Sequence, residues 1–353
     1  MVVVVTPVFN GADVLPRFLD TLKKSKAHQS ITLVAVDNNS SDNSCEILKN
    51  EYPEVILIEN ASNRGFAPAC NQGMQWAIEH GAEYVCLVNQ DLSFSPDWLL
   101  PLVLALREEP SRGAVQPLIM LYPETNLINS CGNELHYLGF GFTNCYRQDI
   151  SKKTFSGITP LAYCSGAALF LSTAALKKVG LFDEEYFMYH EESDLCWRMR
   201  IAGFHPSLVP QSRVYHEYVF AGNTSRKFAL IERNRALNVL KNYQTKTLLL
   251  ILPLFLFWEC GMLFYSMLAS VTQKKTVGVF EKISASAYFL RPRTWRSIYE
   301  WRKKNARLRR VSDREIVTLF TDTIEFQDVS NPLLDRIANP LTQWYWHLVK
   351  RWI

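Results

Sequence analysis

The segment from Phe187 to Arg198 has the clearest chemical content of this chain. It reads Phe-Met-Tyr-His-Glu-Glu-Ser-Asp-Leu-Cys-Trp-Arg, so three carboxylates, a histidine and an arginine stand between apolar residues. Acidic side chains are rarely buried without a partner or a task. Because neighbouring carboxylates repel each other, we expect one of them to have a raised pKa and to act as a general base.

The spacing within this segment separates the acids into two groups. Asp194 and Arg198 stand four residues apart, which is the spacing of an ion pair on a helix. We expect that pair to stabilise the helix, which leaves Glu191 and Glu192 available for a functional role. A solvated helix face is the alternative, since runs of charge usually face water, but the apolar residues on both sides of the acids argue against it.

Short apolar runs alternate with helical patterns in the first quarter of the chain. The runs at 2–5, 31–36, 55–59 and 84–88 are typical of buried strands, and the stretches between them show helical spacing at 12–25, 43–50 and 68–80. This alternation predicts a parallel sheet with helices on both faces. Ligands of such sheets bind at the carboxyl ends of the strands.

Polar residues and glycines follow these runs and are the candidate ligand-binding residues. Asp37 could accept hydrogen bonds from a base or a ribose, although a turn or helix cap is an equally good interpretation. Arg64 could reach a phosphate, although an exposed arginine at a helix start is the commoner case. The candidates are Asp37, Asn39, Arg64, Gly65, Asn71 and Asn89.

Two further residues are candidate metal ligands. Asn89-Gln90-Asp91 resembles an Asp-x-Asp metal motif whose first acid is an amide, and Asp91 can supply the oxygen that a hard divalent cation prefers. His216 follows an expected strand at about 207–214 and is the second candidate. Each alone has an ordinary alternative, a turn for Asp91 and a hydrogen-bonded polar residue for His216.

Beyond residue 113 the pattern loosens. We expect antiparallel strands and loops over 115–150, a strand over 162–171, then a short helix before the acidic segment. Near residue 226 the chain becomes helical, apolar and basic. We therefore predict a catalytic domain over 1–225, with its ligand-binding half at about 1–113 and a second half at about 114–225, and a separate helical region over 226–353.

The combination of these motifs resembles the family 2 glycosyltransferases of the GT-A fold, in particular their bacterial rhamnosyltransferase-like branch. The matching segments occur in the family's order across residues 2–225: 6–10, 36–42, 63–71, 89–91, 165–167, 180–184, the acidic segment and His216. The resemblance implies an α/β fold, a Rossmann-like mixed sheet with flanking helices.

The resemblance also implies roles. Thr6, Pro7, Asn10, Asp37 and Arg64 fall where the family holds the nucleotide of an activated sugar. Asp91 falls on the metal-binding acid, and His216 on a histidine that helps to bind the metal–diphosphate, so the implied cofactor is Mg²⁺ or Mn²⁺. Glu191 and Glu192 fall on the family's catalytic pair, whose second member is the base. Two positions depart from the family: Asn89 replaces an aspartate, and Glu192 replaces another.

The implied reaction is a single in-line displacement with inversion at the sugar. The donor would be dTDP-rhamnose or a UDP-sugar, and the acceptor a lipid-linked saccharide in cell-surface polysaccharide synthesis. Because Asn89 weakens the case for a metal site, a catalytically weak nucleotide-sugar-binding or scaffold protein of the same fold stays open as the alternative. A nicotinamide-dependent oxidoreductase is disfavoured, since the first strand lacks a glycine-rich turn.

Charge is distributed unevenly along the 353 residues. The chain has a net charge of +4, yet residues 271–310 contain twelve Lys/Arg and two acids, so the remainder is net acidic. Such a segment favours an anionic partner. We expect this partner to be a membrane surface, because the basic segment lacks any recognised nucleic-acid-binding module.

The region before the basic segment is strongly apolar. Residues 248–271 are long enough to cross a bilayer, but Glu259 near the middle and Pro253 are unfavourable in a plain span. Helices lying at the membrane surface fit better, and the Trp/Tyr and Lys/Arg mixture of residues 341–353 fits an interfacial helix. A soluble helical subdomain is the alternative. The expected location is the cytoplasmic face of the cell membrane, peripheral or monotopic.

The eight cysteines show no CxxC pair. Their positions in expected strands and helices predict buried free thiols of a reducing compartment, without disulfides. The start of the chain, Val2–Val5 followed by Thr6-Pro7, lacks the features of a signal peptide.

Overall fold

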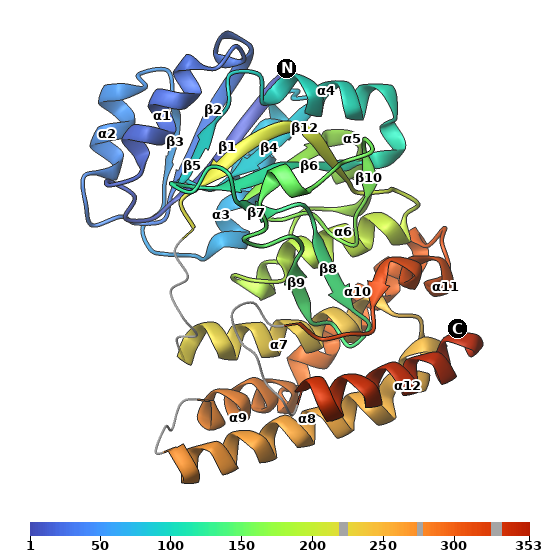
Figure 1. Cartoon of the computed structure of the whole chain (residues 1–353). Helices are drawn as coiled ribbons and strands as arrows, with labels where there is room; N and C mark the ends of the chain where they lie inside the picture. Colours follow the sequence, from blue (N-terminus) through green and yellow to red (C-terminus); the bar gives the residue numbers. More distant parts are fainter. Residues whose placement is uncertain (219–224, 274–277, 326–333) are drawn as a thin grey trace. The chain divides into compact units, whose positions relative to one another are not determined.

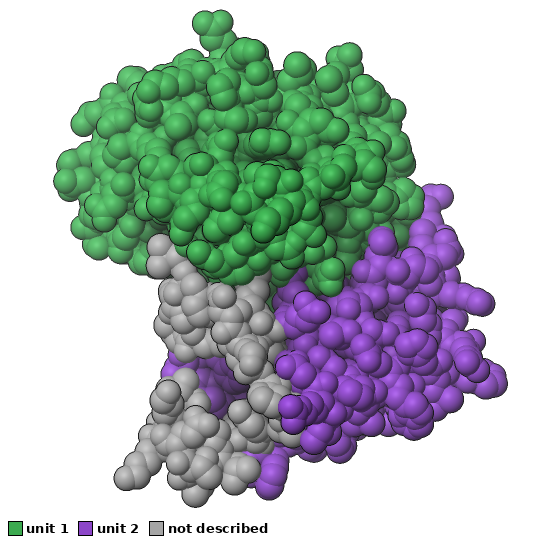
Figure 2. Space-filling view, viewed as in Figure 1, with its two compact units in different colours: residues 1–134, 143–219 green, residues 135–142, 220–353 purple. Residues whose placement is uncertain are grey.

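The computed structural model describes residues 1–218, 225–273, 278–325 and 334–353. Two members of the basic segment, Lys274 and Lys275, lie outside these ranges. The chain divides into two compact units, residues 1–134 with 143–219 and residues 135–142 with 220–353 (Figure 2). The predicted boundary near residue 225 lies close to this division, but the short segment 135–142 belongs to the second unit.

The first unit is built on a ten-stranded mixed sheet with the main order β10-β12-β6-β11-β4-β1-β2-β3 (Figure 1). The expected parallel core is present, because β1 pairs in parallel with both β2 and β4, and β2 pairs in parallel with β3. These strands and their helices are β1 (Val2–Val8), α1 (Leu15–Lys24), β2 (Ile31–Asp37), α2 (Ser44–Glu51), β3 (Ile56–Glu59), α3 (Phe66–Glu79) and β4 (Tyr84–Val88).

The other half of the sheet is mixed in strand direction. Strand β11 (Ala168–Ser172) runs antiparallel to β4 and to β6 (Ala114–Leu121), and β12 (Ser207–His216) pairs in parallel with β6. The remaining elements of this unit are β5 (Leu92–Phe94), α4 (Leu99–Glu108), β7 (Ile128–Ser130), β10 (Thr159–Pro160), α5 (Thr173–Val179) and α6 (Glu191–Ile201). The Rossmann-like mixed sheet implied by the sequence is therefore confirmed.

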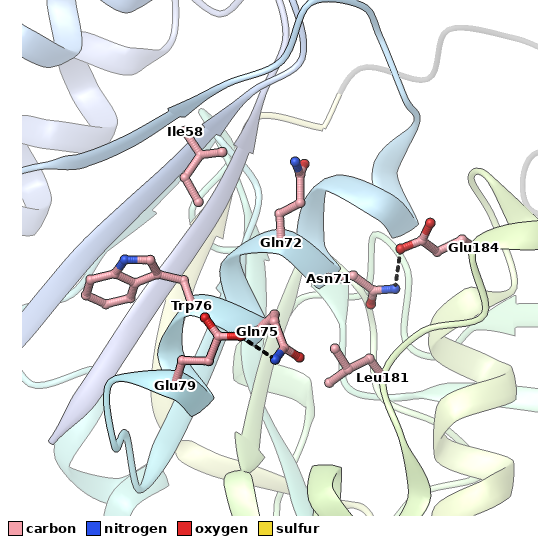
Figure 3. Close-up of a pocket in the computed structure, with 8 residues that line it drawn as sticks. All are labelled: Ile58, Asn71, Gln72, Gln75, Trp76, Glu79, Leu181 and Glu184. Atoms are coloured by element: carbon pink, nitrogen blue, oxygen red, sulfur yellow. Dashed lines mark hydrogen bonds between the residues drawn. The ribbon is translucent and has the colours of Figure 1, made fainter.

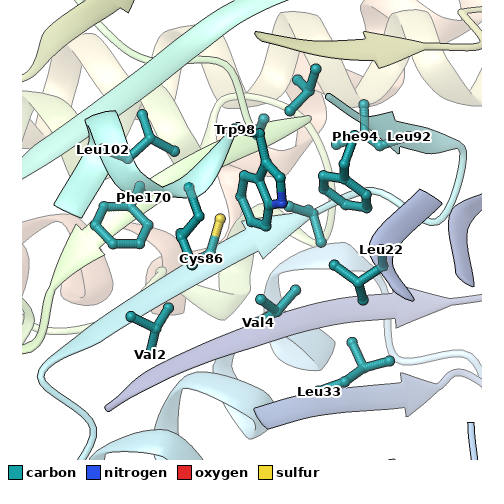
Figure 4. Packing of buried hydrophobic residues seen from close by; sticks show 14 of the residues in the cluster. Val2, Val4, Leu22, Leu33, Cys86, Leu92, Phe94, Trp98, Leu102 and Phe170 are labelled. Atoms are coloured by element: carbon teal, nitrogen blue, oxygen red, sulfur yellow. The ribbon is translucent and has the colours of Figure 1, made fainter. Parts of the chain in front are cut away.

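The core explains why the first strand is apolar throughout. Val2 and Val4 pack into a cluster with Leu22 of α1 and with Phe170 and Trp98 of the neighbouring elements (Figure 4). On the other face of the sheet a β-carbon on Gly73 would lie 2.2 Å from Val5 Cγ1, so α3 lies directly against β1. Burial of both faces is what a continuous apolar strand predicts.

One predicted strand begins later than expected. Residues 162–167 precede β11 as irregular chain, because Ser165 forms a local turn in which its Oγ accepts from Ala167 N at 3.3 Å. The Ser165 amide donates to the side-chain Oε1 of Gln116 at 2.6 Å instead of to a strand. This turn places Gly166 next to the acidic segment, as described below.

The prediction of cysteines without disulfides is wrong for one pair. Cys131 and Cys145 form a disulfide with a Cα–Cα distance of 5.8 Å. The two residues are brought together because Cys131 N donates to Asn144 O at 3.2 Å, between loops that are 14 residues apart in sequence. The other six cysteines are free, as expected.

The second unit is mainly helical. It contains α7 (Ser225–Asn242), α8 (Thr245–Gln273), α9 (Val279–Ala287), α10 (Pro292–Leu308), α11 (Asp313–Ile316) and α12 (Asn339–Val349), with a small sheet in the order β13-β8-β9 formed by β8 (Asn133–His136), β9 (Gly141–Thr143) and β13 (Phe320–Thr321). Within the described residues, one helix segment is long and apolar enough to cross a membrane, Thr245–Phe264, with a mean hydropathy of 2.0.

Candidate functional site

A cavity of about 260 Å³ lies at the carboxyl ends of the parallel strands. Its lining combines the end of β1, the loop after β4, the start of α3 and one residue of the acidic segment. The lining residues are Pro7, Val8, Phe9, Asn38, Asn63, Gly65, Phe66, Asn89, Gln90, Asp91 and Met188. Four of the predicted ligand-binding residues therefore share one cavity: Pro7, Gly65, Asn89 and Asp91.

The two predicted metal ligands also meet, although they are far apart in sequence. Strand β5 pairs antiparallel with β12 so that Leu92 is opposite His216, which brings the residue before Leu92 beside the histidine. His216 Nε2 lies 3.1 Å from Asp91 Oδ1. Asp91 Oδ1 is buried and accepts no hydrogen bond from the described residues.

Asn129 sets the orientation of the His216 ring. His216 Nδ1 lies 3.0 Å from Asn129 Oδ1, an amide oxygen that can only accept. The proton of a neutral imidazole is therefore on Nδ1, and Nε2 presents its lone pair toward Asp91. A lone pair and a carboxylate facing each other repel unless a proton or a cation lies between them.

This donor set fits a divalent cation. Adjacent ligands of an octahedral Mg²⁺ or Mn²⁺ are about 3 Å apart, which agrees with the separation of Asp91 Oδ1 and His216 Nε2. No group of three or more His, Cys, Asp or Glu side chains suited to a metal occurs among the described residues. The protein thus offers two ligands at this point, and Mg²⁺ commonly takes its other ligands from water and substrate phosphates.

Helix α6 carries the acidic segment and is fixed by the predicted ion pair. Arg198 Nε donates to Asp194 Oδ2 at 2.7 Å, and both side chains are buried. Arg198 also donates to the carbonyl oxygens of Val179 and Leu181, each at 2.9 Å. The prediction that Asp194 and Arg198 structure this helix is confirmed, and the solvated-face alternative is wrong.

Glu191 and Glu192 are in a different situation from Asp194. Glu191 is 3% exposed and Glu192 is half-buried, and one carboxylate oxygen of each is buried without a hydrogen-bonding partner among the described residues. Burial, together with the charge of Glu192, raises the pKa of Glu191 well above its usual value. Burial likewise raises the pKa of Glu192 to about 7. A carboxylate with a pKa near neutrality is suited to take up a proton.

Glu192 is next to the elements that form the cavity. A β-carbon on Gly166 would lie 3.8 Å from Glu192 Cδ and 3.7 Å from Cε1 of Phe66, which lines the cavity. The half-buried Glu192 side chain is therefore packed where the 162–167 turn meets the start of α3, and it is more accessible than Glu191.

The loop before α6 has an unusual backbone. Phe187, Tyr189 and His190 all have positive φ values, of 63°, 70° and 68°. Such conformations are costly for residues other than glycine and occur where the surroundings enforce them. Here Phe187 O accepts from Ala67 N at 3.1 Å, and this contact joins the loop to the start of α3. Met188 of the same loop lines the cavity.

Several predicted ligand-binding residues have structural contacts instead. Both carboxylate oxygens of Asp37 accept hydrogen bonds from its own turn, including one from Asn39 N at 3.0 Å, so the turn interpretation describes its contacts. Asn10 Oδ1 accepts from Ser41 N at 2.8 Å and joins the loops after β1 and β2. Thr6 is buried in β1, and its hydroxyl has no partner among the described residues.

Arg64 and Asn71 lie toward a second cavity. Asn71 Nδ2 donates to Phe182 O at 2.9 Å and to Glu184 Oε1 at 3.1 Å, while Arg64 is exposed and lies 3.7 Å from Glu184 Oε2. Asn71, Glu184 and Trp76 line this cavity of about 460 Å³ beside α3 (Figure 3). These contacts attach the 180–184 segment to α3, and the nucleotide-binding role of both residues stays a prediction.

Three site residues were missed by sequence reasoning. Gln90 binds the backbone of Phe9 twice, accepting from Phe9 N at 3.0 Å and donating to Phe9 O at 3.1 Å, and thereby holds the end of β1 at the cavity. Asn38 Nδ2 donates to Gly65 O at 3.0 Å across the same edge. Gln90 and Asn38 lie within motifs that the sequence analysis identified, whereas no sequence pattern indicated a role for Asn129.

Comparison with known proteins agrees with this geometry. Residues 3–178 match the family described as Glycosyl transferase family 2. An N-acetylglucosaminyl-diphospho-decaprenol L-rhamnosyltransferase of Mycobacterium tuberculosis is 28% identical over 233 residues, which are 60% of this chain and 75% of the relative. Rhamnosyltransferase WbbL of Escherichia coli is 24% identical over 151 residues, covering 41% of this chain and 55% of the relative.

Solved structures show the same fold. A crystal structure of GalNAc-T7 with UDP, GalNAc and Mn²⁺ aligns with a TM-score of 0.61 at 15% sequence identity. The alignment covers 98% of this chain and 58% of that chain. At this level of identity the likeness concerns the fold.

Proposed function

The chain belongs to glycosyl transferase family 2, and from that premise we propose that it is an inverting transferase that moves a sugar from a nucleotide-sugar donor to a lipid-linked saccharide. One observation carries the proposal. Glu191 and Glu192 each keep one buried carboxylate oxygen without a hydrogen-bonding partner among the described residues, and Glu192 is packed beside an element of the cavity that Asp91 lines. Buried acids in that state are costly to the fold and are typical of a catalytic site.

In the proposed reaction Glu192 takes the proton of an acceptor hydroxyl. The hydroxyl oxygen then forms a bond to the anomeric carbon of the donor sugar as the bond from that carbon to the diphosphate oxygen breaks. The nucleoside diphosphate leaves with the bonding electrons, and the proton stays on Glu192. A single displacement inverts the configuration of the sugar. The role proposed for Glu191 is that of a flanking acid or a contact to the acceptor.

Asp91 and His216 are the residues that would hold the divalent cation, Mg²⁺ or Mn²⁺. Such a cation would offset the negative charge of the departing diphosphate. Pro7, Gly65 and Asn89 would form the wall against the donor nucleotide, with Gln90 and Asn38 holding this wall in shape. Of the remaining predicted donor-binding residues, Asn10, Asp37 and Asn71 form hydrogen bonds that hold the neighbouring loops. A donor-binding role of these three residues and of Thr6, Asn39 and Arg64 stays a prediction.

The substrate class is proposed from the relatives. Two of them are rhamnosyltransferases by name, and the Mycobacterium protein acts on a diphospho-decaprenol-linked sugar by its name. This supports dTDP-rhamnose as the first donor to test, ahead of UDP-sugars, and a saccharide on a lipid diphosphate as the acceptor. An acceptor of that kind supports a location at the cytoplasmic face of the cell membrane and a role in cell-envelope polysaccharide synthesis.

A donor panel tests the proposal. Purified protein is incubated with Mn²⁺ and dTDP-, UDP- or GDP-sugars, and binding is measured by thermal shift while transfer and hydrolysis are measured by nucleotide release. We expect one donor to bind and react. Glu192→Gln should keep the thermal shift and lose about 10²–10⁴-fold in rate, the usual contribution of a general base.

The control for this variant is Glu79→Gln, an exposed glutamate on α3. Near-normal turnover by Glu192→Gln would remove the residue from the role of base. A donor that binds but is neither transferred nor hydrolysed would favour the scaffold alternative.

A further inference from the structure

Between Leu249 and Met267, helix α8 has an exposed face on which the described side chains carry no charge. The exposed positions recur every three or four residues along one side of the helix: Leu249, Pro253, Leu256, Phe257, Cys260, Gly261, Phe264 and Met267. From Leu249 to Met267 this face is about 27 Å long, given the rise of an α-helix. Contiguous apolar surface of this extent on a protein marks an interaction site.

The opposite face of α8 is packed inside the second unit. Ile251, Leu254, Phe255 and Trp258 are buried there. Glu259, the acid that interrupts the apolar run, lies on this side and forms ion pairs with Lys282 of α9 at 2.7 Å and with Arg235 of α7. The inner side of α8 is therefore held in place by ion pairs, whereas its outer side is apolar.

A second acid completes the cluster behind α8. Glu232 of α7 is paired with Lys282 at 2.5 Å and with Arg235 at 3.2 Å. The four side chains Glu232, Arg235, Glu259 and Lys282, here called the buried ion cluster, contain two acids and two bases. Arg235 also donates to Leu138 O at 3.0 Å, so the cluster attaches the 135–142 hairpin as well.

Neighbouring helices extend the exposed face. In Figure 1, α8, α9 and α12 run side by side, and Tyr345 of α12 donates its hydroxyl to Leu250 O at 2.6 Å. The exposed side of α12 carries Trp344 and Leu348, Trp352 is exposed in the turn that follows α12, and α9 exposes Phe280 and Ile283. Exposed cations follow at the end of the chain, Lys350 and Arg351. Tryptophan beside Lys and Arg is the composition of a helix at a membrane interface.

We propose that α8 lies in the plane of an anionic membrane leaflet, with its uncharged face among the outer acyl chains, and does not cross the bilayer. The inference deepens the proposed function, on which it rests for the lipid-linked acceptor. It assigns the bilayer contact to the outer faces of α8, α9 and α12.

The buried ion cluster is the argument against a crossing helix. If α8 crossed the bilayer, Glu259 would enter the hydrocarbon either alone or together with Arg235 and Lys282. Both alternatives are unfavourable, because ions in hydrocarbon are costly and a buried pair that loses a partner is strongly destabilised. With α8 in the plane, the cluster stays within the protein.

The charges argue for a lipid surface over a second copy of the chain. Two copies joined through this face would bring their Lys350 and Arg351 side chains toward like charges. Anionic headgroups instead attract each nearby cation. Lipid is therefore the complementary partner.

Vesicle binding provides the first test. Leu256→Glu places an acid on the proposed face, and Leu100→Glu makes the same change at an exposed leucine on α4 of the first unit; the two leucines are 52% and 61% exposed. Binding to phosphatidylglycerol-containing vesicles is measured by sedimentation. We expect the first variant to bind at least tenfold more weakly and the second to bind normally. Equal binding by both would overturn the proposal, as would a dimer of the free protein that Leu256→Glu dissociates.

Measuring the depth of two positions of α8 in the bilayer distinguishes a helix that lies in the membrane plane from one that crosses the bilayer. Leu249→Cys and Phe264→Cys, each with Cys260 replaced by Ser, carry a fluorophore that is quenched by nitroxides at known depths in the acyl chain. Fifteen residues of helix span about 22 Å, so a crossing helix would give widely different depths. Equal shallow depths are expected, and a difference near 22 Å would overturn the proposal. Hydrolysis of the donor is measured in parallel, so failure of the membrane arrangement is distinguishable from failure of the transferase activity.

Discussion

Each of the two units contains a pair of glutamates that are buried or half-buried, and the surroundings of the two pairs differ. In the second unit Glu232 and Glu259 are neutralised by Arg235 and Lys282. In the first unit Glu191 and Glu192 each keep a buried oxygen without a hydrogen-bonding partner among the described residues. The difference fits the proposed catalytic role of Glu191 and Glu192 and a stabilising role of Glu232 and Glu259.

The pKa values express the same contrast. Burial alone would raise the pKa of Glu232, but Arg235 and Lys282 lower it to about 2. Burial raises the pKa of Glu192 to about 7. Glu232 therefore stabilises the fold above its unfolded pKa, and this contribution is lost as the pH falls toward 2. Ionised Glu192 destabilises the fold, because the native state holds its proton more tightly than the unfolded state does.

The largest effect is expected from removing a base of the buried ion cluster. Lys282→Met leaves two buried acids to share Arg235, and breaking such a pairing typically costs about 3–5 kcal/mol of stability. Urea unfolding at pH 7 measures the loss. Lys303→Met, at an exposed position on α10, is the control and should change stability little. A small effect of Lys282→Met would break the contrast between the two units.

The second effect is on the rate of transfer. Because the base must be deprotonated and burial raises the pKa of Glu192 to about 7, kcat/KM should increase about tenfold from pH 6 to pH 8 and level off above pH 8. A pH–rate profile with the preferred donor measures this. A flat profile between pH 5 and pH 8 would mean that Glu192 has an ordinary carboxylate pKa or is not the base.

The smallest expected effect is an increase in thermal stability, whereas Lys282→Met is expected to lower stability. Between its usual value of 4.5 and about 7, Glu192 loses its proton more easily in the unfolded chain, so native stability decreases as the pH rises. Glu192→Gln removes this penalty. We expect its Tm to equal that of the unaltered protein at pH 4 and to exceed it by a few °C at pH 8. A lower Tm of the variant at pH 8 would contradict the assignment of an uncompensated acid.

Patterns among residues close together in the sequence predicted much of the fold and part of the site. The strand–helix alternation of the first 88 residues is present, and the i, i+4 spacing of Asp194 and Arg198 predicted their ion pair. The resemblance to the family placed Asp91 and His216 at one site. Their meeting depends on the pairing of β5 with β12, which no local pattern contains.

Contacts between residues far apart in the chain could not be predicted from the sequence. Glu259 looked like an interruption of an apolar run, because Arg235 and Lys282 lie about two dozen residues away on either side of it at no periodic spacing. The disulfide between Cys131 and Cys145 joins loops without secondary structure of their own. Asp37 and Asn71 have the right chemistry for ligands, but local turns and the 180–184 segment use their hydrogen-bonding groups.

The close approach of Gly65 to Phe187 has an evolutionary consequence. Gly65 has a φ of 96°, and a β-carbon there would lie 2.5 Å from Phe187 Cδ2 and 2.7 Å from Phe187 O. A larger residue at 65 would push the loop that carries Met188 away from the donor cavity. Any relative that keeps this loop in place should therefore keep glycine at 65. An alignment of homologues should show position 65 as invariant.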